Sequence, residues 1–93
     1  MNITVLGAGE IGRHLSTRLS ERGHDIRVIE QDEAIAAQLA HALDAKVVRG
    51  DGTLAQTLIE AEVPQCDLFV ACTTFNNTNL VACYLAKQVG AQK

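Results

Sequence analysis

The chain has 93 residues, of which 47% are hydrophobic and 20% charged, and this composition is typical of one small globular domain. Its formal net charge is −3 and its eight basic residues form no cluster, which argues against nucleic acid or an anionic membrane surface as a partner. No apolar run approaches the roughly 20 residues of a membrane span, and no basic leader precedes the first one. We therefore expect neither membrane insertion nor a signal peptide.

A glycine motif lies between a predicted strand and a predicted helix. Residues 3–6 are apolar, and the sequence GAGEIG at residues 7–12 has the G-x-G-x-x-G pattern of a dinucleotide-binding loop. In that pattern Gly7 makes the tight turn, Gly9 lets a pyrophosphate approach the backbone, and Gly12 lets the helix pack against the strand. The N-terminus of the helix favours an anion there. The alternative is a glycine-rich turn that binds nothing.

The first helix is expected over residues 10–22, with Ile11, Leu15 and Leu19 forming its buried stripe. The second strand then follows over residues 25–30, where apolar and polar residues alternate. These two elements complete the first half of a nucleotide-binding unit.

Glu30 ends the second predicted strand, eighteen positions after Gly12. An acidic residue at about this distance accepts hydrogen bonds from the adenosine ribose. A carboxylate suits a free 2′,3′-diol and repels a 2′-phosphate, and no arginine follows to receive such a phosphate. The sequence therefore favours NAD over NADP. The alternative is that Glu30 is a solvated strand end.

A second helix capped by Asp32, with Ile35, Leu39 and Leu43 buried, precedes a short third strand over residues 46–49.

A third helix is expected to begin at Thr53, because Thr53 and Gln56 have the spacing of a capping box, and Leu54, Leu58 and Ile59 would face inward. Just before it, the turn at residue 51 is expected at the same sheet edge as the glycine motif. There the Asp51 carboxylate has the chemistry to accept a hydrogen bond from the adenine amine, and ordinary turn chemistry is the alternative.

The fourth predicted strand, residues 67–71, is apolar without alternation, as in a strand covered on both faces. Thr73 closes this strand beside the glycine loop and is a candidate ligand contact. Asn76 and Asn77 are expected to cap the final helix, or alternatively to touch a ligand. Its apolar positions lie within residues 80–89.

Strands and helices therefore alternate along residues 1–93, which predicts one nucleotide-binding domain of the α/β class. Its Rossmann-like parallel sheet would have the order 3-2-1-4, with helices on both faces. Residues 90–93 resemble a turn into a fifth strand, so the outer edge of strand four is expected to lie open. We expect either a truncated domain or one completed by another segment or subunit.

Three cysteines, Cys66, Cys72 and Cys83, lack C-x-x-C spacing, and the histidines lack metal-ligand spacing, so we expect reduced thiols and no metal site. Cys72 and Cys83 lie in apolar segments, where a free cysteine behaves as a small hydrophobic residue.

The glycine motif, Glu30, the turn at residues 50–52, and residues 71–73 followed by Asn79 and Leu80 together resemble the TrkA N-terminal domain, also called the RCK or KTN domain. The resemblance covers essentially the whole chain. Members are cytosolic subunits or domains that bind NAD(H) or adenine nucleotides such as ATP or ADP and gate a membrane potassium channel or transporter. It implies a non-enzymatic, cytoplasmic regulatory domain that reaches the membrane through its protein partner and forms a homo-oligomer.

Carried over to this chain, the resemblance implies a ribose contact at Glu30, an adenine contact at Asp51 and a pocket wall at Thr73. The residues it implies for the pyrophosphate are those of the motif, Gly7, Ala8, Gly9, Glu10, Ile11 and Gly12. Two features depart from the family pattern. Asn76 and Asn77 stand where an acidic residue is usual, and the fifth and sixth strands and dimerising helices of the family are not in this sequence.

An NAD-dependent dehydrogenase or reductase is the alternative function, with this chain as its cofactor-binding half. Hydride transfer needs a substrate pocket and a group that moves a proton, and no histidine or lysine of this sequence is placed as that base. A P-loop kinase or ATPase is disfavoured, because Arg13 and His14 follow the glycines in place of Lys and Ser or Thr.

Overall fold

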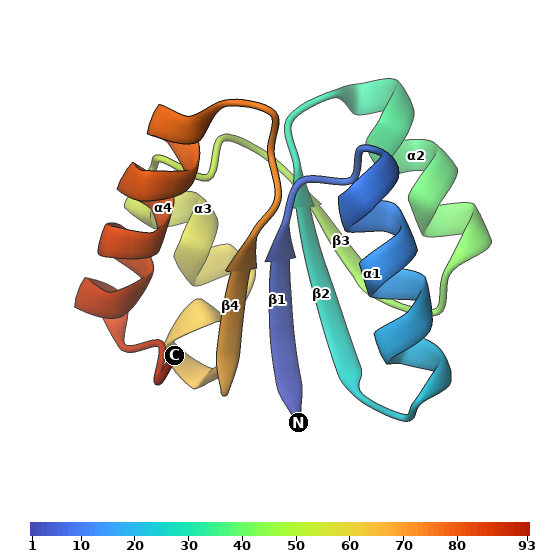
Figure 1. Ribbon diagram of the computed structural model, residues 1–93, viewed down its shortest axis with the longest axis horizontal. Helices are drawn as coiled ribbons and strands as arrows, with labels where there is room; N and C mark the ends of the chain where they lie inside the picture. Colours follow the sequence, from blue (N-terminus) through green and yellow to red (C-terminus); the bar gives the residue numbers. More distant parts are fainter.

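The computed structural model describes all 93 residues and contains a four-stranded parallel sheet in the order β3-β2-β1-β4. This confirms the predicted Rossmann-like α/β fold and its strand order. The elements are β1 (Asn2–Leu6), α1 (Glu10–Glu21), β2 (Asp25–Glu30), α2 (Glu33–Ala42), β3 (Lys46–Arg49), α3 (Ala55–Glu60), the 3₁₀ helix η1 (Val63–Gln65), β4 (Leu68–Ala71) and α4 (Asn76–Val89). Helices α1 and α2 cover one face of the sheet, and α3 and α4 cover the other (Figure 1).

The strand register aligns apolar side chains across the sheet. Val5 of β1 lies opposite Val28 of β2 and Val70 of β4, and these residues pack with Leu39 on the side of α1 and α2. Side chains of adjacent residues in a strand point to opposite faces, so both faces of this sheet are apolar. The same register brings the carboxyl ends of all four strands to one edge.

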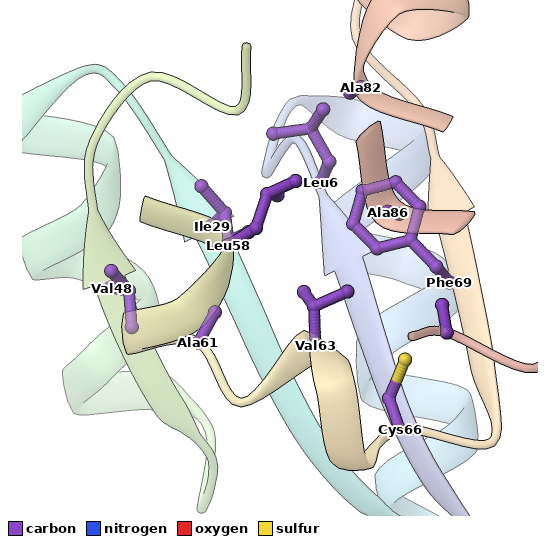
Figure 2. Close-up of a cluster of buried hydrophobic side chains, with 11 residues drawn as sticks. Leu6, Ile29, Val48, Leu58, Ala61, Val63, Cys66, Phe69, Ala82 and Ala86 are labelled. Carbon is purple, nitrogen blue, oxygen red and sulfur yellow. The ribbon is translucent and has the colours of Figure 1, made fainter. Parts of the chain in front are cut away.

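The other face of the sheet carries the larger buried cluster. Leu6, Ile29 and Phe69 from three strands pack against Leu58 of α3 and Val63 of η1 (Figure 2). Each of these side chains is at most 7% exposed. Burying a side chain of this size stabilises the fold by about 1.5–3 kcal/mol. This layer fixes α3 and α4 to the sheet and so positions the loop between β4 and α4.

Helix α1 meets the sheet through small residues, and the predicted stripe was wrong at Ile11. Gly12 and Ser16 are buried, whereas Ile11 is 74% exposed and Leu15 is half-buried. A Cβ placed on Gly12 would overlap the carbonyl oxygen of Gly7. The close approach at Gly12 turns this side of the helix toward β1, and Ile11, about 100° around the helix, therefore faces outward.

Helix α3 begins at Ala55, and the predicted capping box does not form. Leu54 occupies the N-cap position and has no polar side-chain atom to cap the helix, and Thr53 lies one residue before it, where its hydroxyl donates to Asp51 at 2.7 Å. Leu58 is buried as predicted, but Leu54 is 55% exposed and Ile59 is 57% exposed. The capping box fails because the helix begins one residue later than predicted, which places Thr53 outside the N-cap position.

Helix α4 buries alanines and exposes most of its large apolar residues. Ala82 and Ala86 face the core, whereas Leu80 and Tyr84 are 71% and 67% exposed. Cys83 is also exposed, so the expectation that it acts as a buried hydrophobic residue was wrong. Small residues face the sheet because the helix packs close to it, Leu85 and Val89 pack partly buried against the core, and the remaining large side chains lie on the outer surface.

The start of α4 differs from the prediction as well. Asn76 and Asn77 are exposed and lie in the first turn of the helix, whose N-cap is Phe75 with no side-chain cap. Capping by these two asparagines was therefore a wrong prediction.

The outer edge of β4 is partly covered, which corrects the prediction of an open edge. The chain turns at Gly90, Ala91 is buried in the core, and the Lys93 carbonyl accepts a hydrogen bond of 2.8 Å from the Phe69 N–H. The C-terminus consequently lies beside β4 (Figure 1).

Candidate nucleotide site

A cleft of about 270 Å³ opens at the carboxyl ends of the strands. It brings together five of the predicted site residues, which lie at the end of a strand or in the loop after it: Gly7, Gly9, Glu30, Asp51 and Thr73. The loops leave the strand ends at one edge of the sheet, which explains how distant parts of the sequence meet there (Figure 1). Parallel α/β sheets bind ligands at this kind of edge.

The other predicted residues of the glycine motif do not line this cleft. Ala8, Glu10 and Ile11 line a wider, open groove of about 990 Å³ between α1 and α2, and Gly12 is buried beneath the loop. Gly9 and Ile35 line both hollows. The side chains of Glu10 and Ile11 therefore lie on the groove side, and only backbone groups of these residues remain for a ligand in the cleft.

Two glycines of the motif have different reasons to be glycine. Gly7 has a φ of +105°, and a Cβ there would lie 3.0 Å from the backbone of Cys72, so this position excludes other residues on both counts. Gly9 has an extended conformation, and a Cβ there would meet no atom within 4 Å. The space over Gly9 is thus free for a ligand group to approach the backbone.

The amide groups around this space are partly unpaired. The N–H groups of Glu10, Ile11 and Gly12 have no hydrogen-bond partner in the chain, and Arg13 is the first residue of α1 whose N–H donates into the helix, to Gly9 at 2.8 Å. Unpaired N–H groups at a helix N-terminus, together with the helix dipole, favour an anion.

Glu30 holds two backbone segments together. Its Oε1 accepts a hydrogen bond of 2.7 Å from the Ala8 N–H, and its Oε2 accepts one of 2.8 Å from the Asp32 N–H. The interpretation of Glu30 as a solvated strand end is therefore wrong. A carboxylate has about four acceptor positions, so both oxygens retain capacity for the hydroxyl groups of a ligand.

Asp51 hydrogen-bonds within its own turn, as the alternative interpretation of this residue predicts. Its Oδ1 accepts hydrogen bonds from the Thr53 N–H at 2.9 Å and from the Thr53 hydroxyl at 2.7 Å. These bonds lower the pKa of Asp51 below its ordinary value, so the side chain is anionic at neutral pH. Its Oδ2 makes no hydrogen bond in the chain and remains available as an acceptor beside the cleft.

Thr73 is held by Asn79, a residue to which the sequence assigned no role in the site. The Asn79 side chain bonds to the N–H, the hydroxyl and the carbonyl of Thr73. Asn79 was one of the residues that carry the resemblance to the TrkA N-terminal domain, but its spacing from Thr73 alone did not indicate this contact.

The cleft has a clear distribution of charge. Glu30 and Asp51 lie on the side of β2 and β3, and no lysine, arginine or histidine lines the cleft. An anionic group therefore fits only at the N-terminus of α1, whereas hydroxyl and amine donors suit the two carboxylates. That is the distribution of polar groups along an adenosine phosphate.

The sequence profile of the TrkA-N domain matches residues 3–93. The chain belongs to the TrkA-N domain family. This TrkA-N domain is 38% identical over all its 93 residues to the Trk system potassium uptake protein TrkA homolog of Methanothermobacter thermautotrophicus, and it spans 43% of that protein. It is 43% identical over 89 residues to the TrkA homolog 2 of Methanosarcina mazei, of which it spans 19%.

Two solved structures show the same fold. The TrkA-N domain superposes on the Shewanella denitrificans Kef CTD in AMP bound form with a TM-score of 0.80 and 20% identity, over 95% of this chain and 52% of that one. It superposes on a short chain dehydrogenase/reductase family oxidoreductase of Aeromonas hydrophila with a TM-score of 0.76 and 22% identity, over 94% and 51% of the two chains. No helix of the TrkA-N domain has the length and apolarity to cross a membrane.

Proposed function

We propose that this TrkA-N domain binds an adenine nucleotide, with NAD(H) as the first candidate and ATP or ADP as alternatives, and so regulates potassium transport. The observation that carries the proposal is the cleft itself. Gly9, with free space over it, lines the cleft at the start of α1, whose first N–H groups are unpaired, and the carboxylates of Glu30 and Asp51 line the same cleft.

In the proposed complex the phosphates lie over Gly9 and the first turn of α1. The ribose hydroxyls donate to Glu30, the adenine amine donates to Asp51, and the second half of a dinucleotide extends toward Thr73. The Glu30 carboxylate disfavours a 2′-phosphate by charge repulsion, so NADPH should bind more weakly than NADH.

The relatives support the link to potassium. The curated proteins that this chain matches are named as Trk potassium uptake proteins, and the Kef CTD structure was solved with AMP. We infer that the domain acts at the cytoplasmic side of the membrane, through protein contacts with a potassium channel or transporter.

Only the shared fold supports the alternative that this chain is the cofactor-binding part of a dehydrogenase. Besides Glu30 and Asp51, the cleft contains one titratable group, the Cys72 thiol, whose pKa is raised by burial. At neutral pH this thiol holds its proton, and no histidine, lysine or tyrosine lines the cleft to move one. We therefore propose a regulatory domain and not an enzyme.

Calorimetric titration with NADH, NAD, ATP, ADP and NADPH tests the proposal. We expect at least one adenine nucleotide to bind, and NADH to bind more tightly than NADPH. Equal affinity for NADH and NADPH would contradict the ribose assignment to Glu30, and no binding by any of the five would contradict the function. Turnover of NADH with common carbonyl substrates would instead support the enzyme.

We further propose that the outer face of α4 mediates self-association. Leu80, Val81 and Tyr84 are between 46% and 71% exposed on this helix. Contacts through apolar side chains persist at moderate salt, unlike contacts between charges. Sedimentation at several protein and salt concentrations should therefore show association that salt does not abolish, and Leu80→Asp should weaken it. A wild-type domain that stays monomeric at high concentration would refute this interface.

A further inference from the structure

Asn79 lies in the first turn of α4 and its side chain spans back to the end of β4. Its Oδ1 accepts hydrogen bonds from the Thr73 N–H at 3.1 Å and from the Thr73 hydroxyl at 2.6 Å, and its Nδ2 donates to the Thr73 carbonyl at 3.0 Å. These three bonds define the orientation of the Asn79 amide. A flipped amide would place its NH2 group against the Thr73 N–H and its oxygen against the Thr73 carbonyl oxygen. One side chain thus engages every polar group of Thr73.

The segment that this contact closes forms one rim of the cleft. Thr73, Thr74, Phe75 and Thr78 all line the cleft. Phe75 is 69% exposed, so apolar packing does not hold the rim in place. Apart from the hydrogen bonds between Thr73 and Phe75 within the turn, the side-chain hydrogen bonds that hold the rim are those of Asn79.

We propose that Asn79 is a positioning residue of the nucleotide cleft, which sets the place of Thr73 and its rim and thereby the affinity for the distal half of a dinucleotide. This inference rests on the proposed nucleotide binding. In the sheet, β4 lies on the far side of β1 from β2 and β3. Thr73 is therefore separated by about two to three strand spacings, roughly 10–15 Å, from the strands that end near Glu30 and Asp51.

Because Thr73 lies this far from Glu30 and Asp51, the binding of AMP and of NADH should depend differently on the rim. AMP, held by the carboxylates and by the amides over Gly9, ends near the glycine loop, whereas NADH is long enough to reach the rim at Thr73. A misplaced rim should weaken the binding of NADH much more than that of AMP. A general loss of structure would instead weaken both ligands alike.

The experiment compares Asn79→Ala with Asn77→Ala, a matched control in the same turn of α4 whose side chain is exposed and makes no hydrogen bond. Calorimetry gives the affinities for NADH and AMP, and NMR hydrogen exchange reports the Thr73 amide. For Asn79→Ala we expect about tenfold weaker NADH binding, less than about twofold weaker AMP binding, and faster exchange at Thr73. Asn77→Ala should match the wild type in all three.

Asn79→Asp provides a second variant if Asn79→Ala does not fold. It retains the acceptor for the two Thr73 donors but turns a second carboxylate oxygen toward the Thr73 carbonyl in place of the donor. It should therefore keep the Thr73 amide better protected than Asn79→Ala does, and still bind NADH more weakly than the wild type.

Three results would overturn the inference alone. They are unchanged NADH affinity, equal losses for NADH and AMP, and weaker NADH binding without faster exchange at Thr73. A wild-type domain that does not bind NADH would overturn this inference, and one that binds none of NADH, NAD, ATP, ADP and NADPH would overturn the proposed function with it. The wild-type titration distinguishes the two cases.

Discussion

Replacing Glu30 by alanine separates the two roles that the structure and the proposed function give to this carboxylate. In the folded chain it accepts the N–H groups of Ala8 and Asp32, and in the proposed complex it also accepts the ribose hydroxyls. The first role acts on the stability of the unliganded domain, and the second acts on nucleotide affinity. Glu30→Ala should therefore lower both.

The sizes of the two effects follow from the contacts. Ala8 is 3% exposed and its N–H loses its acceptor, which costs about 1–3 kcal/mol for a buried donor. The adjoining cleft lets water approach, so we expect a value near 1 kcal/mol for the loss in the free energy of unfolding. A hydrogen bond to a charged group contributes about 1.5–3 kcal/mol, so NADH binding should weaken at least roughly tenfold.

Urea unfolding and calorimetry measure the two effects on the same samples. Glu33→Ala is the matched control, because Glu33 carries the same charge three positions away and its side chain is 80% exposed in a 3.9 Å contact with Arg49. This control should change stability and NADH affinity little. If Glu30→Ala and Glu33→Ala unfold at the same urea concentration and bind NADH equally, the reasoning about Glu30 is refuted.

Two further predictions concern the glycine loop and the far end of the sheet. Gly9→Val should keep its circular dichroism spectrum and lose NADH binding, because its side chain enters the free space over the loop. Gly12→Val should unfold, because its Cβ overlaps the Gly7 carbonyl. A folded Gly9→Val that binds NADH would disprove the proposed position of the phosphates. The Arg27 Nε donates to Glu62 at 2.9 Å, which lowers the pKa of Glu62, so this pair stabilises the fold above the ordinary glutamate pKa of about 4.3 and ceases to do so as the pH falls through the lowered value. The stability difference between wild type and Glu62→Gln in urea should thus be largest at neutral pH and shrink in acid, and a difference that is constant with pH would contradict it.

The sequence by itself determined the order of elements and the place of the cleft. Alternating strand and helix patterns with short connections specify a parallel sheet with right-handed crossovers, and the glycine motif marks where the first loop must be narrow. Because the carboxyl ends of parallel strands share one edge, Gly9, Glu30, Asp51 and Thr73 could be expected near one another from their positions alone. These features depend on local periodicity and on chain direction, and both can be read from a sequence.

Only the tertiary structure decided what individual side chains contact. Ile11 faces outward because Gly12 meets the Gly7 carbonyl, and Glu30 reaches the Ala8 amide, twenty-two positions away in sequence. Asn79 bonds Thr73 although Asn76 and Asn77 were the better capping candidates by position. In each case several partners are chemically equivalent in the sequence, and the choice among them depends on distances that exist only after the strands and helices have packed.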